Sequence, residues 1–271
     1  MNVTGDIRVG IGGWTFEPWR GVFYPDRLPQ KQELAFASRK VTAIEINGTF
    51  YGSQKPESFA KWHDETPDDF VFSLKGPRFT TNRRVLAEAG ESVNRFVASG
   101  IARLKAKLGP INWQMAATKT FQPEDFEAFL ALLPREADGL ALRHVVEVRH
   151  ASFMVPEFVG LLRRYGVGAV FADEPDYPHF FDPTADFVYL RLQCAQEAEP
   201  VGYAPEVLDA WARRASIWAS GGIPDDLPRI DGGAVIPQQP RDVFIFMING
   251  HKPKAPAAAM ALIARLNGPD A

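Results

Sequence analysis

Short apolar runs alternate with segments of helical periodicity along almost the whole chain, and this alternation leaves few folds open. We count eight such runs, at residues 7–12, 43–46, 70–74, 111–115, 144–148, 168–171, 187–192 and 243–248. Strands that alternate with helices build βαβ units, in which the strands lie parallel. The chain is therefore predicted to form either a closed parallel barrel or an open, doubly wound sheet.

Helical patterns fill the intervals between these runs, at residues 32–38, 56–65, 92–108, 123–133, 156–165, 205–220 and 255–266. Several begin with a proline, Pro56 and Pro156 among them. Proline suits the first turn of a helix because the N–H that it lacks has no partner there. In 92–108 the apolar residues recur at intervals of three and four, which is typical of one face of a helix.

The number of runs favours a TIM (β/α)8 barrel over the open sheet. Such a barrel commonly occupies roughly 250 residues, and this chain has 271 with no domain-sized linker. We therefore predict a single barrel domain over residues 1–271. Residues 221–240 are rich in glycine, proline and aspartate, which predicts a surface excursion before the last strand.

Composition excludes several classes of protein. The formal net charge is −3, so no global positive field draws the chain to nucleic acid or to an anionic membrane. The one cysteine, Cys194, excludes an internal disulfide framework and a cysteine-rich zinc site. The first residues lack the apolar stretch of a signal peptide, and residues 257–264 are too few to span a bilayer. We expect a cytoplasmic protein without a membrane partner.

Polar residues gather where the predicted strands end, which is where a parallel barrel carries its chemistry. In strand order they are Trp14; Glu45, Asn47 and Thr49; Lys75; Gln114; Glu147, Arg149 and His150; Asp173; Arg191 and Gln193; and Asn249. The side chains of Glu45, Asn47 and Thr49 would share one side of an extended chain, because that alternation has a period of two. A barrel core without a site would show valine, isoleucine and leucine at these positions.

The residue types suggest an enzyme that acts on a small anionic substrate of sugar or nucleotide type. Glu45 and Glu147 would be the acid and base of a hydrolysis, as in the cleavage of a glycosidic bond or a phosphate ester. Lys75, Arg149 and Arg191 would hold a phosphate or carboxylate group. The remaining candidates for substrate binding are Trp14, Asn47, Thr49, Gln114, His150 and Asn249.

The sequence suggests neither a metal nor a cofactor. Three cations at the same face would oppose a metal ion, and no His-x-x-x-His pair occurs. Gly10-Ile11-Gly12-Gly13 lacks the third glycine of a dinucleotide-binding fingerprint. There is also no phosphate loop and no Gly-x-Ser-x-Gly elbow.

Other interpretations of the same residues remain open. Glu45 with Lys75, and Glu147 with Arg149, would be structural ion pairs. A non-catalytic binder of carbohydrate or nucleic acid would use the aromatic rings near the strand ends as stacking surfaces. Lys75 would be the Schiff-base nucleophile of a lyase if burial and neighbouring cations lowered its pKa, or a permanent cation if Glu45 kept it protonated.

A set of motifs over almost the whole chain resembles the YecE-like family, known as domain of unknown function 72. The motifs are Gly12-Gly13-Trp14, Trp19-Arg20-Gly21-Val22-Phe23-Tyr24-Pro25, Glu45-Ile46-Asn47-Gly48-Thr49-Phe50-Tyr51, Trp62 with Thr66-Pro67-Asp68-Asp69-Phe70, Phe72-Ser73-Leu74-Lys75-Gly76-Pro77, Glu147-Val148-Arg149-His150 and Tyr189-Leu190-Arg191. The resemblance implies a TIM barrel and brings no established activity.

The chain departs from the pattern of that family at three places on the expected active face. The usual Gln-Leu-Pro-Pro after the fourth strand is Gln114-Met115-Ala116-Ala117 here, so Ala116 replaces a proline. The usual His-Gly after the seventh strand is Gln193-Cys194, and the usual Asn-Asn or Asn-Asp after the eighth is Asn249-Gly250.

Overall fold

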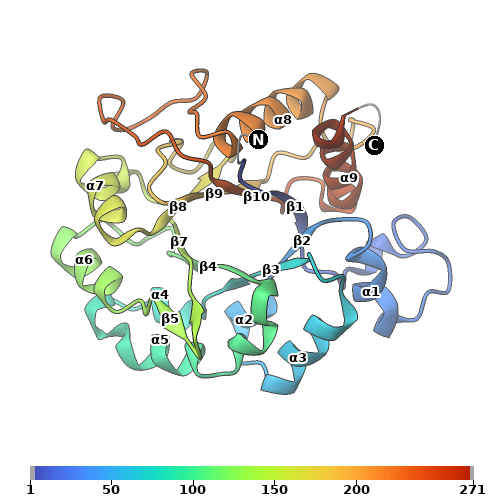
Figure 1. Ribbon diagram of the computed structural model, residues 1–271, viewed down its shortest axis with the longest axis horizontal. Coiled ribbons are helices and arrows are strands. Elements are labelled where there is room, and N and C mark those ends of the chain that lie inside the picture. Colours follow the sequence, from blue (N-terminus) through green and yellow to red (C-terminus); the bar gives the residue numbers. More distant parts are fainter. Residues whose placement is uncertain (1–3, 269–271) are drawn as a thin grey trace.

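Eight parallel strands close into a barrel in the computed structural model, which describes residues 4–268 (Figure 1). Around the barrel the order is β1-β10-β9-β8-β7-β4-β3-β2, and β1 pairs with β2 to close it. The strands are β1 Ile7–Gly12, β2 Ala43–Ile46, β3 Val71–Lys75, β4 Leu108–Gln114, β7 His144–Glu147, β8 Gly168–Ala172, β9 Phe187–Leu192 and β10 Asp242–Met247. The predicted TIM barrel is confirmed, and all eight predicted runs are its strands.

Helices surround this barrel on the outside (Figure 1). They are α1 Glu33–Ala37, α2 Gly48–Tyr51, α3 Pro56–Glu65, α4 Arg78–Thr81, α5 Gly90–Val97, α6 Pro123–Ala131, α7 Pro156–Tyr165, α8 Pro205–Ala219 and α9 Ala255–Asn267. Proline occupies the first turn of α3, α6, α7, α8 and α9, as the sequence indicated for several of them. Within residues 4–268 no helix combines the length and the apolarity that crossing a bilayer requires.

The prediction of one helix over residues 92–108 is wrong. The helix α5 ends at Val97, a separate 3-10 segment covers Ile101–Lys107, and Leu108 already belongs to β4. Gly100 lies between them with φ of 100°, a left-handed conformation that ends a helix. A side chain at Gly100 would also come within 2.8 Å of Pro56, at the start of α3. The apolar periodicity of residues 92–108 therefore reflects their burial and not a continuous helix.

Several short elements were not predicted, among them a hairpin and two one-turn helices. A hairpin joins β5 Glu136–Ala137 to β6 Leu140–Ala141 through Asp138 and Gly139, which both have positive φ. The one-turn helices α2 and α4 follow β2 and β3 directly. Because they begin at the carboxyl ends of these strands, they form part of the rim of the barrel.

Residues 221–240, between α8 and β10, contain neither helix nor strand. In Figure 1 they form loops that project outward from the molecule. The buried guanidinium of Arg241 holds the base of this excursion, because it donates to the carbonyls of Gly221, Pro237 and Gln239. Val235, within the excursion, is 95% exposed.

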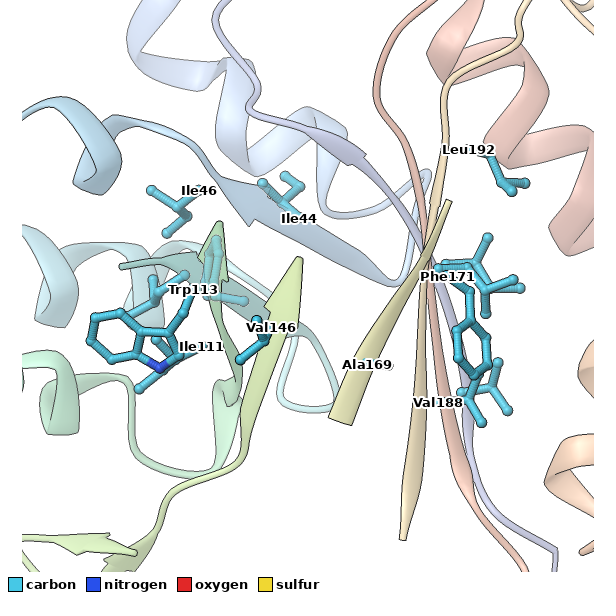
Figure 2. Close-up of a cluster of buried hydrophobic side chains, with 14 of the residues drawn as sticks. Ile44, Ile46, Ile111, Trp113, Val146, Ala169, Phe171, Val188 and Leu192 are labelled. Carbon is cyan, nitrogen blue, oxygen red and sulfur yellow. The ribbon is translucent and has the colours of Figure 1, made fainter. Parts of the chain in front are cut away.

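Side chains on each strand alternate between the helices and the barrel interior. One set packs outward, as Figure 2 shows for Ile111, Trp113 and Phe171. The ring of Trp113 meets Phe129 of α6, and that of Phe171 meets Trp218 of α8. The inward set forms a separate cluster in the barrel: Ala43, Val145, Val170, Phe187, Tyr189, Phe244, Phe246 and Ile248. Polar and charged residues complete the inward set nearer the carboxyl ends of the strands.

Candidate functional site

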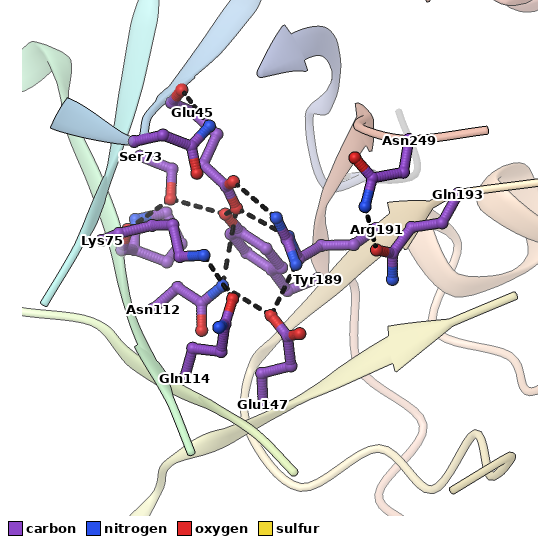
Figure 3. Close-up of polar contacts among 12 residues, drawn as sticks. Glu45, Ser73, Lys75, Asn112, Gln114, Glu147, Tyr189, Arg191, Gln193 and Asn249 are labelled. Carbon is purple, nitrogen blue, oxygen red and sulfur yellow. Dashed lines mark hydrogen bonds and ion pairs between the residues drawn. The ribbon is translucent and has the colours of Figure 1, made fainter. Parts of the chain in front are cut away.

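A network of buried polar side chains lies inside the barrel at the carboxyl ends of the strands (Figure 3). The period of two that places Lys75, Gln114 and Arg191 inward also places the residues two positions earlier, Ser73, Asn112 and Tyr189, inward. Ser73, Asn112 and Tyr189 are fully buried. Contacts between β9 and β2 or β3 cross the interior, because these strands are not neighbours in the barrel.

Arg191 of β9 binds two carboxylates from different strands. Its Nε and Nη2 donate to the two oxygens of Glu45 on β2 at 3.0 and 3.1 Å, in a bidentate fork. Its Nη1 donates to Oε2 of Glu147 on β7 at 2.7 Å. All three side chains are at most 3% exposed. Such a pairing is what allows ionised groups to remain buried.

Further donors complete both carboxylates. Arg149 donates from Nε and Nη2 to Oε1 of Glu147 at 2.8 and 2.7 Å, which confirms the expected Glu147–Arg149 pair. The Tyr189 hydroxyl donates to Oε2 of Glu45 at 2.7 Å, and the Asn112 amide donates to Glu147 at 3.3 Å. Burial alone would raise the pKa of Glu147, but Arg191 and Arg149 outweigh it and hold the pKa at about 2.

Lys75 does not pair with Glu45, so that expectation is wrong. Among the described residues, the Lys75 ammonium donates to Oε1 of Gln114 and lies 4.5 Å from the centre of the Phe50 ring. Burial, followed by the positive charge of Arg191, lowers the pKa of Lys75 to about 8. The carboxylates of Glu45 and Glu147 act in the opposite direction and do not restore the ordinary value.

A cavity of about 630 Å³ opens above this network at the barrel mouth. Its polar and aromatic lining includes Trp14, Asn47, Phe50, Tyr51, Gln54, Trp62, Lys75, Gln114, Arg149, Arg191, Asn249 and Lys252. Neither Glu45 nor Glu147 is in the lining, because both lie beneath the arginines that they bind. The wall of the cavity therefore presents cations, amides and aromatic rings.

The structure brings most of the predicted site residues together. Trp14, Asn47, Lys75, Gln114, Arg149, Arg191 and Asn249 line the cavity, and Glu45 and Glu147 lie directly below it. The predicted alternation of Glu45, Asn47 and Thr49 ends early, because β2 stops at Ile46 and α2 begins at Gly48.

Thr49 and His150 are not among the cavity-lining residues. The Thr49 hydroxyl is buried, donates to the Lys75 carbonyl at 2.7 Å and lies 3.1 Å from the Ile46 carbonyl, which joins α2 to β3. Nδ1 of His150 accepts from the Ser152 amide at 3.1 Å and caps the turn that follows. Both side chains therefore have local structural roles, and the prediction that they bind substrate gains no support from the geometry.

The sequence interpretation missed Ser73, Asn112 and Tyr189, although a signal for them exists. Each precedes a predicted inward residue by two positions, and each is polar where a barrel core would be apolar. The Ser73 hydroxyl lies 2.7 Å from the Tyr189 hydroxyl, which in turn orients Glu45. Lys252, from the loop before α9, was also missed and carried no such signal.

Asp173, at the end of β8, holds the loop that leaves β9. Its carboxylate accepts from the backbone amide of Gln193 and, at 3.2 Å, from the hydroxyl of Tyr203. Burial raises the pKa of Asp173 to about 6, against these hydrogen bonds. Burial and the charge of Asp173 also raise the pKa of the Cys194 thiol to about 12, so this cysteine is not an activated nucleophile.

Two departures from the family pattern fall in this loop region. Gly250 has φ of 73°, and a side chain there would come within 2.3 Å of the Ala195 carbonyl, so the close pairing of these two residues requires glycine. Gln193 accepts from Asn249 at 3.2 Å, while its own Nε2 is buried without an acceptor in the described part of the chain. Among residues 4–268, no group of three histidine, cysteine, aspartate or glutamate side chains is placed to hold a metal ion.

The curated relatives that this chain matches carry no assigned activity in their descriptions. The chain is 29% identical over 150 residues to UPF0759 protein YecE of Escherichia coli (strain K12), an alignment that covers 54% of this chain and 50% of the relative. The chain thus spans about half the length of the curated relatives that it matches.

Solved structures agree over nearly the full length. A DUF72 family protein of Thermotoga maritima superposes with a TM-score of 0.73 at 23% identity, covering 97% of this chain and 99% of the other. A second, from Enterococcus faecalis, gives 0.70 at 16% identity, with 98% and 99% covered. The family model described as "Protein of unknown function DUF72" matches residues 8–271, and the chain belongs to this family.

Proposed function

We propose that the barrel mouth binds a small molecule of sugar or nucleotide type through a phosphate or carboxylate group. The observation that carries this proposal is the distribution of charge. Four cations, Lys75, Arg149, Arg191 and Lys252, line the cavity, while the two carboxylates that bind the two arginines lie underneath. The two lysines therefore leave positive charge for a ligand.

The donors of these cations are only partly used within residues 4–268. Lys75 gives one of its three N–H groups to Gln114. Arg149 gives Nε and Nη2 to Glu147, which leaves its Nη1 for a ligand, and its guanidinium lies 4.6 Å from the centre of the Tyr177 ring. Arginine held in this way is preorganised for an oxyanion, because its position does not have to be fixed at the moment of binding.

The geometry shifts the proposed chemistry from the glutamates to Lys75. A general acid needs a proton at working pH, and the low pKa of Glu147 keeps it ionised and paired. Hydrolysis by Glu45 and Glu147 therefore gains no support. Lys75 lies in the wall of the cavity with a pKa of about 8, so the ammonium and the free amine are both populated near neutral pH. We propose proton transfer by Lys75 as the reaction step.

Schiff-base formation is a second candidate, favoured by the same lysine. The free amine of Lys75 would add to a substrate carbonyl, and the carbonyl oxygen would leave as water to give an imine. Borohydride would reduce this imine and leave a stable secondary amine on Lys75. Schiff-base formation is tested by adding borohydride in the presence of a panel of phosphorylated aldehydes and ketones, followed by mass spectrometry of the peptide that contains Lys75. If no adduct forms with any member of the panel, the proposal of a Schiff-base lyase is overturned.

Binding itself is tested by the stabilisation that inorganic phosphate gives to the folded protein, because a ligand of the native state alone raises the melting temperature in a saturable way. We expect the apparent affinity for phosphate, measured from this shift, to fall at least tenfold in Arg149→Gln and in Lys75→Met. The matched control is Arg103→Gln, which removes an exposed arginine outside the cavity. Equal shifts in all variants would overturn the proposal.

A non-catalytic binder of the same anion is the alternative from another class. Lys75→Arg distinguishes the two, because arginine keeps the charge but neither transfers a proton at neutral pH nor forms an imine. A binder retains its affinity in Lys75→Arg and has no turnover to lose. An enzyme retains phosphate binding in Lys75→Arg but loses turnover of the phosphorylated aldehyde or ketone that the wild type converts.

A further inference from the structure

A second basic hollow lies beside the mouth, on the same end of the barrel. It has a volume of about 270 Å³ and is formed by the loops that follow β3 and β4. The side chains that give it its character are Asn82, Arg83, Arg84, Thr118, Lys119 and Thr120. Three of them are cations, and no aspartate or glutamate is among the described residues that line it.

Two of the three cations of this hollow are free of ion pairs within residues 4–268. Arg83 and Arg84 take part in no salt bridge there, and Nε of Arg83 is buried without a hydrogen-bond acceptor. Lys119 forms an ion pair with Asp125 at 3.7 Å. The two guanidinium groups without an ion pair are suited to an oxyanion, which arginine binds through charge-assisted hydrogen bonds.

Lys119 also gives the hollow a fixed shape. Its side chain is 12% exposed, and its Nζ donates to the Arg84 carbonyl at 2.8 Å. The two loops are therefore joined across the hollow by an ammonium that still has donors to spare. A set of solvated surface cations would show neither this burial nor this cross-link.

The hollow and the mouth share a wall. Thr81, which lines the hollow, donates from its hydroxyl to the Gln114 carbonyl at 2.6 Å. The side chain of Gln114 lines the mouth and accepts from Lys75. Ala116, which replaces a proline of the family pattern, lies two positions further on and lines the hollow.

We propose that this hollow is a second oxyanion site, which receives the second phosphate-type group of the ligand whose first anionic group occupies the mouth. The inference rests on the proposed function of the mouth and specifies its ligand as one with two separated anionic groups. A sugar bisphosphate and a short oligonucleotide both have this chemistry.

Calorimetric titration of the full chain tests the inference with two matched pairs of probes. The first pair is a hexose bisphosphate and the corresponding monophosphate, and the second is a phosphorylated dinucleotide and the mononucleotide. The wild type should bind at least one doubly anionic probe roughly tenfold or more tightly than its partner, because the second contact becomes intramolecular. The pair that shows the gain identifies the source of the ligand.

Arg83→Gln/Arg84→Gln should abolish this gain and leave the affinity for the monophosphates unchanged. The control Arg39→Gln/Arg103→Gln removes the same charge from exposed arginines in segments that lead into β2 and β4, at the opposite end of the strands. A gain that persists in Arg83→Gln/Arg84→Gln, or no gain for either pair in the wild type, would overturn the inference. Failure of the proposed function differs visibly: neither monophosphate would bind the wild type, and the inference would fall with it.

Discussion

The interior of the barrel holds two layers that obey opposite rules. In the layer towards the amino ends of the strands, the rings of Phe187 and Phe244 pack at 6.1 Å between their centres within an apolar cluster. The guanidinium of Arg143 covers both rings at the outer edge of this layer. In the layer above it, Glu45, Glu147 and Arg191 are equally buried but charged. The two layers come from the same barrel and are equally buried, so we attribute the difference in polarity between them to function.

Energy distinguishes the layers. Apolar burial stabilises the lower layer by about 25 cal/mol for each Å² removed from water. Buried charges lose hydration that their attraction scarcely replaces, so a packed apolar layer would serve stability at least as well. We therefore interpret the upper layer as an arrangement that holds Arg191 and Arg149 in place below a ligand. The stability of this layer depends on every partner being present.

Removing Arg191 should break the upper layer most severely. In Arg191→Met two carboxylates remain buried without their shared cation, and we expect a loss of about 3–5 kcal/mol in the free energy of unfolding. Urea denaturation at several pH values measures it. The deficit should shrink as the pH falls from 7 towards 5, because buried carboxylates without a cation have raised pKa values and become protonated.

Phe244→Ala is the counterpart in the lower layer. A phenylalanine deleted from a core also loses about 3–5 kcal/mol, but the deficit should not change over the same pH range, since no titrating group loses its partner. A deficit in Arg191→Met as independent of pH as that of Phe244→Ala would contradict the charged description of the upper layer.

Glu147→Gln should remove one pH-dependent part of the stability. The folded pKa of Glu147 is about 2, below the ordinary value of 4.5, so its contribution is present above pH 4.5 and is lost as the pH falls to about 2. At pH 7 we expect Glu147→Gln to lose about 2–3 kcal/mol, because charge-assisted hydrogen bonds from Arg149 and Arg191 become weaker. Acid denaturation curves that keep the same difference from pH 7 to pH 2 would refute this assignment.

Tyr189 lies on the boundary of the two layers, so Tyr189→Phe measures how much its polar contact with the upper layer contributes to stability. Its ring packs 5.1 Å from that of Phe246, while its hydroxyl donates to Glu45. The substitution keeps the ring and deletes the hydroxyl. We expect a loss of about 1–2 kcal/mol in the free energy of unfolding, the effect of an unmade buried hydrogen bond. Phe246→Leu, which alters packing alone, is the control, and a neutral Tyr189→Phe would show that the boundary is apolar.

The sequence predicted the barrel well because its strands are local signals. All eight apolar runs became strands, three of them with the predicted bounds, at Ile7–Gly12, Ala43–Ile46 and Phe187–Leu192. The helix over 92–108 was overpredicted because periodic burial does not reveal a left-handed glycine such as Gly100. Elements of one turn or of two residues, such as α2 and the β5–β6 hairpin, carry too few residues for any period to show.

The sequence predicted many of the residues that line the cavity, but not which cation pairs with which carboxylate. The strand-end rule found Lys75, Gln114, Arg149, Arg191 and Asn249 correctly as neighbours of one cavity. It could not show that Arg191, on a strand three positions from β2 by the shorter route around the barrel, would reach Glu45 before Lys75 did. Which cation satisfies which carboxylate depends on distances across the interior, and these follow from barrel closure and not from adjacency in the sheet.

The smallest expected effect concerns the protonation of Lys75 when an anion occupies the mouth. Its pKa of about 8 predicts that sulfate binding weakens above pH 8, by at most roughly tenfold for each further pH unit, as the ammonium loses its proton. Sulfate keeps the same charge between pH 6 and 10, so any change in its affinity belongs to the protein. Lys75→Arg should bind sulfate with no such decline, because arginine stays charged throughout. Lys75→Met should bind weakly at every pH. Melting temperatures measured against sulfate concentration from pH 6 to 10 provide the three curves. If wild type and Lys75→Arg decline together, the titrating group is not Lys75, and the charged layer presents only Arg149 and Arg191 to its ligand.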